Sequence, residues 1–324
     1  MNEYRISVVI PAWNAEPYIA RTLDGILAQT YPVEEIIVSD DASTDGTKDV
    51  VQKYVSKHGE RVKYIWHEHA GCGGSRNIAI RHAQCEWIAL HDADDIWLPH
   101  RIASQVRVLQ ANPQLKWCGA NYDVIWLNQD GGTARISTQR WSAELEAHLR
   151  ADRPVDFFAT GMDLAYYPSA MLMHRSIFDK LGLFDESLPL MEDRDMWWRV
   201  ALQYPLIGYP AEVCCHYHKN VPGAMTDFNV RGPGRDVEAT ILLRHLQTAT
   251  EIGGQVEETY RAFGKRLMYD YLFREAGGQA TIRPDLVEGL RSGFGLTVRE
   301  RLVLTAVKAL PRRLAYRMVN RYRL

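Results

Sequence analysis

The chain has 324 residues, of which 46% are hydrophobic and 24% are charged, and its formal net charge at pH 7 is −2. This composition is ordinary for a soluble globular protein, and the length allows one large domain or a domain with an appendage. The near-neutral charge argues against nucleic acid as a partner, and no segment reaches the roughly 18 uninterrupted apolar residues of a membrane-spanning helix.

The cysteines are few and irregularly spaced. Their number, five, is odd, and no two of them have the CxxC spacing of zinc or redox sites. The apolar run in MNEYRISVVIPAW is too short for a signal peptide. A disulfide framework is therefore not expected, and we expect a cytoplasmic protein. The cysteines are Cys72, Cys85, Cys118, Cys214 and Cys215.

Short apolar runs alternate with segments of helical periodicity through the first half of the chain. This alternation indicates right-handed βαβ units, and so an α/β fold with a mostly parallel sheet flanked by helices. In such a sheet, ligands bind beyond the carboxyl ends of the strands. The predicted strands cover residues 6–13, 35–39, 62–67 and 87–91. The predicted helices cover residues 15–29, 44–57, 75–84 and 99–111, with Ser43 or Thr44 capping the second.

The second half of the chain is more mixed and ends in helices. From about residue 227 the pattern is helical, so we expect an α/β domain over 1–225 and a helical C-terminal region over 226–324. Before that point, strand-like runs lie at 117–126, 170–174 and 213–218, and a predicted helix lies at 192–204.

The last part of the chain is basic and has helical periodicity. Two interpretations are open: helices that pack on the first domain, or an interfacial helix over 296–324 that lies on anionic lipid. The apolar stripe consists of Val303, Val307, Leu310, Leu314 and Met318, and Arg312, Arg313, Arg317 and Arg321 lie largely off it.

Acidic residues follow two of the predicted strands. ALHDADDIW contains Asp92, Asp94 and Asp95, and VSDDASTDGT contains Asp40 and Asp41. Mg²⁺ and Mn²⁺ prefer oxygen ligands, so the first group is either a metal site completed by substrate phosphates or a solvated turn. The second group is either a helix-capping turn or a place where a carboxylate accepts hydrogen bonds from a base and a ribose.

A glycine-rich stretch, HAGCGGSRNIAI, precedes the third predicted helix. Its glycines suggest close approach by a phosphate, but Arg76 occupies the last position of a GxGxxG pattern, and no GK[ST] motif occurs. Arg76 therefore either lies near a nucleotide or pairs with a surface acid. Asn77 can bond the neighbouring loop.

Two further stretches carry residues that suit catalysis or metal binding. PLMEDRDMWWRVALQYP places Glu192 and Asp193 at the start of a predicted helix, where the helix dipole favours anions. These acids are either an ordinary first turn or include a general base. In CCHYHK, His216 and His218 point to the same face of a strand, as structural residues or as ligands of a metal or a diphosphate.

Five segments, in their order along the chain, resemble the inverting family 2 glycosyltransferases with a GT-A fold. They are SVVIPAWN, IIVSDDASTDGT, GGSRNIAI, WIALHDADD and SAMLMHRSIFDKLGLFDESLPLMEDRDMWWRVA. The resemblance covers roughly residues 5–220 and implies a Rossmann-like GT-A sheet. It implies transfer of a sugar from a nucleotide-diphosphate sugar, UDP-sugar first, to an acceptor hydroxyl of a sugar or glycolipid. The QxxRW motif of processive members is absent, so we expect transfer of a single sugar.

The resemblance also implies roles for individual residues. Asp193 would be the catalytic base. Asp94 and Asp92 would hold Mn²⁺ or Mg²⁺, with His218 or His216 as further candidate ligands. The pathway implied is the synthesis of bacterial cell-surface polysaccharide or glycolipid. The nucleotide-sugar would be bound by Pro11, Ala12, Asn14, Asp40, Asp41, Arg76, Asp92 and Glu192.

Two other functions are compatible with an acidic α/β domain. A sugar-nucleotide nucleotidyltransferase would need a glycine-rich, basic phosphate loop near the N-terminus, and SVVIPAWNAEPY has none. A non-catalytic nucleotide-sugar-binding module would not need both the DxD and the ED elements, and both are present. The glycosyltransferase is therefore the favoured hypothesis.

Overall fold

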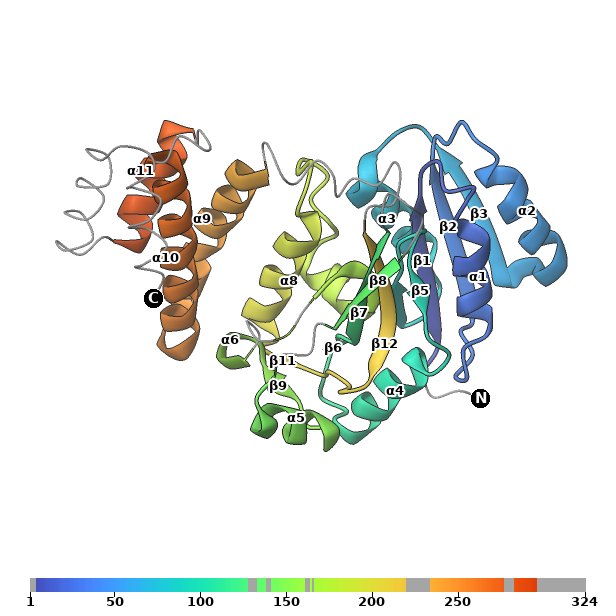
Figure 1. Ribbon diagram of the computed structural model, residues 1–324, viewed down its shortest axis with the longest axis horizontal. Coiled ribbons are helices and arrows are strands. Elements are labelled where there is room, and N and C mark those ends of the chain that lie inside the picture. The colour runs from blue at the N-terminus through green and yellow to red at the C-terminus, as the bar shows by residue number, and fades with distance from the viewer. Residues whose placement is uncertain are drawn as a thin grey trace. The chain divides into compact units, whose positions relative to one another are not determined.

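The chain divides into two compact units, Met1–Asp227 and Phe228–Leu324, which are described separately. The first unit contains a sheet flanked by helices, and the second is helical (Figure 1). The computed structural model describes residues 4–127, 133–137, 141–160, 164, 166–219, 234–276 and 283–295.

The main sheet of the first unit has the strand order β3-β2-β1-β4-β10-β6. Neighbouring strands from β3 to β4 are parallel, whereas β10 is antiparallel to both β4 and β6. The parallel strands therefore end at one edge of the sheet, which confirms the predicted α/β architecture. The strands are β1 (Ile6–Ala12), β2 (Glu35–Asp41), β3 (Val62–His67), β4 (Trp87–Leu90), β6 (Trp117–Cys118) and β10 (Leu172–His174).

Two smaller sheets complete the first unit. One has the order β5-β12-β7-β8, and in it β12 runs antiparallel to β5 and parallel to β7; the other pairs β11 with β9. Their strands are β5 (Ile96–Trp97), β7 (Asn121–Leu127), β8 (Thr133–Ser137), β9 (Val155–Asp156), β11 (Leu206–Ile207) and β12 (Val213–Lys219).

The prediction of one strand over residues 117–126 is wrong, because this run divides between two sheets as β6 and β7. The division falls at Gly119, whose N–H donates to the Gly208 carbonyl at 2.8 Å. A Cβ at Gly119 would lie 2.8 Å from Cδ2 of Tyr209, so the close approach requires glycine.

Helices flank the main sheet, and α3 packs directly on β1 and β2. Every residue of β1 and of β2 is buried, as expected of parallel strands with both faces covered. This buried centre fixes the strand ends that carry the candidate site. The helices are α1 (Ile19–Leu27), α2 (Thr47–His58), α3 (Gly71–His82), α4 (Arg101–Ala111), α5 (Ala143–Arg150), α6 (Phe157–Thr160), α7 (Ser176–Leu181) and α8 (Glu192–Gln203), with 3-10 turns at η1 (Gly59–Arg61) and η3 (Pro168–Ala170).

The predicted cap of the second helix is wrong, because α2 begins at Thr47 and not beside Ser43 or Thr44. Those two residues contact the loop after β1 instead. The Ser43 hydroxyl accepts from the Asn14 N–H at 2.9 Å, and the Thr44 N–H donates to the Asn14 side-chain oxygen at 2.9 Å. The Asp45 carboxylate accepts from the Thr47 N–H at 3.0 Å.

The described part of the second unit contains α9 (Gly234–Ile252), α10 (Gly254–Ala276) and α11 (Pro284–Phe294), which pack against one another. Tyr260 and Phe294 are buried between them, with ring centroids 6.3 Å apart. The apolar stripe predicted near the end of the chain, and the arginines beside it, lie outside the described residues. Within the described part of the chain, no helix is both long enough and apolar enough to cross a membrane.

Glu35 is a buried carboxylate at the start of β2 that ties together three neighbouring segments. One of its oxygens accepts from the Ser7 hydroxyl and from the Gln84 N–H, both at 2.6 Å, and the other from the Lys63 ammonium at 2.6 Å. Burial raises the pKa of Glu35, but the hydrogen bonds from Lys63, Ser7 and Gln84 outweigh it, so the pKa is lowered overall.

We expect Glu35→Ala to lower the free energy of unfolding by about 3 kcal/mol, because it leaves buried donors without an acceptor. The folded-state pKa is lowered, so this contribution is present above the ordinary value of 4.5 and is lost as pH falls through the folded-state pKa. Urea unfolding at neutral and acidic pH measures both effects.

Glu34→Ala is the matched control. The Glu34 contact with Arg5 is 3.6 Å long and exposed, so its loss should change the free energy of unfolding by less than about 0.5 kcal/mol. Equal losses in the two variants would contradict the role given to Glu35.

Candidate active site

The loop after β4 carries three aspartates in different surroundings. Asp95 is fully buried: its Oδ2 accepts from the Ser169 hydroxyl at 2.5 Å and its Oδ1 from the His218 N–H at 3.0 Å. The Ser169 hydroxyl in turn accepts from the Asp92 N–H at 2.9 Å. Burial and the charges of Asp94 and Asp92 raise the pKa of Asp95. Asp95 therefore anchors the loop to η3 and β12.

Asp94 is half-buried, and no side chain among the described residues hydrogen-bonds to its carboxylate. Its backbone carbonyl accepts from Arg21 at 2.7 Å. Burial, and then the charge of Asp92, raise the pKa of Asp94 to about 6. The negative charges of Asp92 and Asp94 repel each other, and a bound cation would stabilise this pair of carboxylates.

The donor set of this loop suits a hard divalent cation that takes part of its coordination from a substrate. Carboxylate oxygens are preferred by Mg²⁺, which is commonly held by one or two carboxylates plus substrate phosphates. Among the described residues, no three His, Cys, Asp or Glu side chains are grouped so as to hold a metal ion. Asp92 and Asp94 therefore fit such an ion only together with ligands from elsewhere.

Arg76 is a buried cation between two acids from distant parts of the chain. Its Nη2 donates to Asp92 Oδ1 at 2.7 Å and its Nη1 donates to Glu192 Oε1 at 2.6 Å, and 3% of its side chain is exposed. Burial lowers the pKa of Arg76, but neighbouring Cys72, Asp92 and Glu192 raise it well above its ordinary value, so it stays charged. The predicted pairing of Arg76 with an acid is thus found, but inside the protein and with two acids.

The glycine-rich stretch lies in the first turn of α3, which begins at Gly71 and not at residue 75 as predicted. A Cβ at Gly73 would lie 3.2 Å from Glu192 Cγ, and a Cβ at Gly74 would lie 2.8 Å from the Cβ of Ala70. In this structure, Gly73 and Gly74 make room for protein neighbours. Gly73 in particular allows α3 to approach the start of α8.

Asp193 is the second residue of α8 and lies beside Glu192. Its Oδ1 accepts from the Arg194 N–H at 2.7 Å. Burial, and then the charge of Glu192, raise the pKa of Asp193 to about 6, against the opposing effects of Arg76 and Arg194. A half-buried carboxylate with such a pKa is suited to accept a proton near neutral pH.

The next turn of α8 is closed to solvent. Trp197 and Trp198 are each 4% exposed, as expected of side chains that exclude water from the neighbouring acids. Asp195 is also buried, and its carboxylate accepts from Arg199 at 2.8 Å. The start of α8 therefore places the half-buried carboxylate of Asp193 next to three buried side chains, those of Asp195, Trp197 and Trp198.

The candidate nucleotide-binding residues meet at the carboxyl ends of β1 and β2. Pro11 pairs with Ser39 and Ala12 pairs with Asp40 in the strand register. Asn14 follows β1 with a left-handed φ of 48°. The structure thus brings together residues that the sequence places in two separate motifs.

The carboxylates of Asp40 and Asp41 already have protein donors. Asp40 accepts from the Ser43 N–H at 2.8 Å and from the Tyr64 hydroxyl at 2.7 Å. Asp41 accepts from the N–H groups of Ala70 at 2.5 Å and Gly71 at 3.1 Å, and so caps the start of α3 from a neighbouring strand. Direct contact of either carboxylate with a base stays a prediction.

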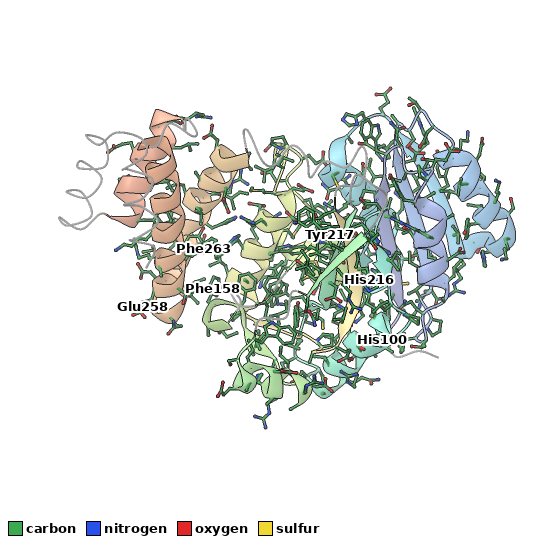
Figure 2. All side chains as sticks on the ribbon, in the orientation of Figure 1. His100, Phe158, His216, Tyr217, Glu258 and Phe263 are labelled. Carbon is green, nitrogen blue, oxygen red and sulfur yellow. The ribbon has the colours of Figure 1, made fainter. Side chains whose placement is uncertain are left out.

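His216 and His218 lie on β12, one on each side of Tyr217 in the sequence. Figure 2 labels His216 and Tyr217. Burial, and then the charges of Arg21 and His216, lower the pKa of His218 to about 4, so its ring is neutral. A metal contact for either histidine stays a prediction, because neither is grouped with two further His, Cys, Asp or Glu side chains among the described residues.

The sequence gives no local signal for two residues beside the acidic loop, Ser169 and Tyr217. Burial and the charges of Asp95, Asp92 and Asp94 raise the pKa of Tyr217, and its ring centroid lies 4.9 Å from that of Tyr167. Both residues come from segments far along the chain from the loop, so only the folded structure shows that they adjoin it.

Residues 7–182 match the model of the family described as glycosyl transferase family 2. An uncharacterized glycosyltransferase of Rickettsia prowazekii (strain Madrid E) is 28% identical over 205 residues, which cover 60% of this chain and 58% of that protein. The UDP-Glc:alpha-D-GlcNAc-diphosphoundecaprenol beta-1,3-glucosyltransferase of Escherichia coli is 33% identical over 126 residues, which cover 39% of this chain and 48% of that protein. The matches therefore span about half the length of these two relatives.

Solved structures resemble the chain over nearly its whole length. TarS of S. aureus in complex with UDP-GlcNAc has a TM-score of 0.66 at 18% identity and covers 97% of this chain and 90% of its own. The mannosyltransferase PcManGT of Pyrobaculum calidifontis in complex with GDP-Man and Mn²⁺ has a TM-score of 0.58 at 20% identity, over 99% and 85% of the two chains. These likenesses show the fold, which is the predicted GT-A fold. Since the family model also matches more than half of the chain, across the strand-end acids and the buried Arg76, this protein belongs to glycosyl transferase family 2.

Proposed function

We propose that this glycosyltransferase moves a single sugar, with inversion and with a divalent cation, from a nucleotide-diphosphate sugar to an acceptor hydroxyl. One observation carries the proposal. The buried Arg76 binds Asp92 of the acidic loop and Glu192 at the start of α8, so the metal-binding acids and Asp193 belong to one connected site.

Asp193 acts as the general base in this proposal. Its carboxylate removes the proton from the acceptor hydroxyl while the hydroxyl oxygen forms a bond to the anomeric carbon of the donor sugar. The bond from that carbon to the diphosphate oxygen breaks on the opposite face, and the bonding electrons leave with the nucleoside diphosphate. Attack and departure on opposite faces invert the anomeric configuration.

Asp94 and Asp92 would hold the Mn²⁺ or Mg²⁺ ion, and the ion would act as a Lewis acid that stabilises the charge of the departing diphosphate. Asp95 keeps the loop in place through Ser169 and His218. Because Arg76 binds one oxygen of Asp92, Asp94 is the residue with the more open carboxylate.

UDP is the first choice for the donor nucleotide. In support, TarS was solved with UDP-GlcNAc, and the Escherichia coli relative is a glucosyltransferase that uses UDP-Glc. The Pyrobaculum calidifontis enzyme was solved with GDP-Man and Mn²⁺, which supports the cation and makes GDP the alternative. Pro11, Ala12, Asn14, Asp40 and Asp41 would surround the nucleoside at the ends of β1 and β2.

Bacterial cell-surface polysaccharide or glycolipid synthesis is the pathway we propose. Relatives include the glucosyltransferase that acts on a GlcNAc-diphosphoundecaprenol and a putative teichuronic acid biosynthesis glycosyltransferase of Bacillus subtilis (strain 168). A lipid-linked acceptor would suit a cytoplasmic enzyme that contacts the membrane through residues 296–324, a contact that stays a prediction because these residues are outside the described part.

We expect Asp193→Asn to lower kcat roughly a thousandfold, since the amide cannot accept the proton. Wild-type kcat/KM should fall below about pH 6, where Asp193 of the free enzyme becomes protonated, and at pH 5 it should be about tenfold below its plateau. The assay is release of nucleoside diphosphate from UDP-glucose, UDP-N-acetylglucosamine and GDP-mannose with Mn²⁺. Calorimetry should show unchanged donor affinity, and wild-type turnover by the variant would remove Asp193 as the base.

We expect Asp94→Ala to weaken UDP binding about tenfold or more in the presence of Mn²⁺ and to leave metal-free binding unchanged. Isothermal titration calorimetry with and without Mn²⁺ measures the difference. Asp179→Asn, an exposed acid of α7, is the control and should behave as wild type. Equal Mn²⁺-dependent affinity in wild type and Asp94→Ala would exclude Asp94 from the metal site.

A further inference from the structure

Asn77 of α3 binds both backbone polar groups of Phe184. Its Nδ2 donates to the Phe184 carbonyl at 2.9 Å, and its Oδ1 accepts from the Phe184 N–H at 2.9 Å. Nδ2 also donates to the Glu186 carboxylate at 2.8 Å. Asn77 is 1% exposed, so these hydrogen bonds are shielded from water.

Phe184 begins the segment that leads to the proposed base. The segment ends at Met191, and α8 follows with Glu192 and Asp193. Two consecutive residues of α3 hold this segment. Asn77 binds Phe184 at its start, and Arg76 binds Glu192, the residue that follows its end. The Phe184 ring also lies under the Arg76 guanidinium, whose Cζ is 5.5 Å from the ring centroid.

The carboxylate of Asp193 has little to hold it directly. Among the described residues, its one hydrogen bond is from the N–H of the next residue, Arg194. The residue before the helix, Met191, has φ 62° and ψ 21°, a left-handed conformation that is unfavourable for a side chain of this kind. Such a conformation persists only where surrounding contacts determine the backbone. The position of Asp193 therefore depends on how the segment from Phe184 to Met191 is fixed.

We propose that Asn77 is a positioning residue for the reaction: it sets the place of Asp193 through the backbone of Phe184, without touching donor, acceptor or metal. The inference rests on the proposed role of Asp193 as the base. It adds a residue that is not among the predicted catalytic, metal-binding or nucleotide-sugar-binding residues.

Only an amide side chain of this length can supply both the donor and the acceptor that Phe184 needs. Asn77→Asp keeps the shape and the acceptor but replaces the donor by an oxygen that faces the Phe184 carbonyl and the Glu186 carboxylate. The segment should then shift or loosen at its start, while the Arg76 bridge keeps Glu192 attached to α3 and to Asp92.

We expect Asn77→Asp to lower kcat roughly tenfold to a hundredfold, as small displacements of a reacting group do, with the donor KM within about twofold of wild type. UDP release from UDP-glucose and UDP-N-acetylglucosamine with Mn²⁺ gives both constants. Hydrogen–deuterium exchange should be faster over residues 184–193 and unchanged in β1 and β2.

Asn112→Asp is the matched control. The Asn112 Nδ2 also donates to two backbone carbonyls, those of Val108 at 2.8 Å and Asp152 at 2.7 Å, and neither partner is a candidate site residue. This variant should keep wild-type kcat and KM. Glu186→Ala removes a partner of Asn77 while leaving Phe184 bound, and it should also keep wild-type kcat.

The proposal is overturned if hydrogen–deuterium exchange over residues 184–193 is as slow in Asn77→Asp as in wild type. It is also overturned if the kcat of Asn77→Asp falls no further than that of Asn112→Asp. A rise in donor KM that accounts for the whole loss of kcat/KM would equally overturn it. Failure of the proposed function is a separate result: Asp193→Asn would then turn over as fast as wild type, whatever the Asn77 variant does.

Discussion

The buried guanidinium of Arg76 is the interaction on which the rest of the site depends. It neutralises Asp92 and Glu192, which lie 100 residues apart in the sequence, in a place where 3% of its own side chain is exposed to solvent. Removing one partner from such an arrangement typically costs about 3–5 kcal/mol, because the remaining charges stay buried without compensation. The charge of Arg76 therefore has a structural role, since it lets the acidic loop and the start of α8 approach each other.

The acids of the site differ in how far neighbouring donors offset their negative charge, and these differences fit their proposed roles. Asp92 has Arg76, and Asp95 has the Ser169 hydroxyl and the His218 N–H. Among the described residues, Asp94 and Asp193 lack a comparable side-chain partner, and for both of them burial and a neighbouring carboxylate raise the pKa to about 6. Asp94, proposed to bind the cation together with Asp92, and Asp193, proposed to accept a proton, both require an open carboxylate oxygen. A folded protein keeps such groups at a cost in stability where function needs them.

Much of the fold and of the candidate site follows from local patterns in the sequence. Alternating apolar runs and helical segments predict the parallel sheet, and acids directly after strands or at a helix start predict where Asp94 and Asp193 lie. Contacts between distant segments cannot be predicted in this way. Nothing near Asp41 indicates that its carboxylate caps α3, and nothing near Ser169 indicates that its hydroxyl joins Asp92 to Asp95. The division of one apolar run at Gly119 depends on Tyr209, which belongs to a different segment.

A general base has to leave its carboxylate oxygens free for the substrate, so it cannot be positioned by strong hydrogen bonds to those oxygens. The alternative is to fix the backbone that carries it. In the proposed site, α3 would do so with residues of one helix: Gly73 permits close contact with Glu192, Arg76 binds the Glu192 carboxylate, and Asn77 binds the Phe184 backbone. The left-handed φ of Met191 then turns the chain into α8 at the required point. Under this proposal, the glycine-rich helix for which the sequence suggests phosphate binding would instead hold the base in place, because that role requires a rigid element that the reaction itself does not change.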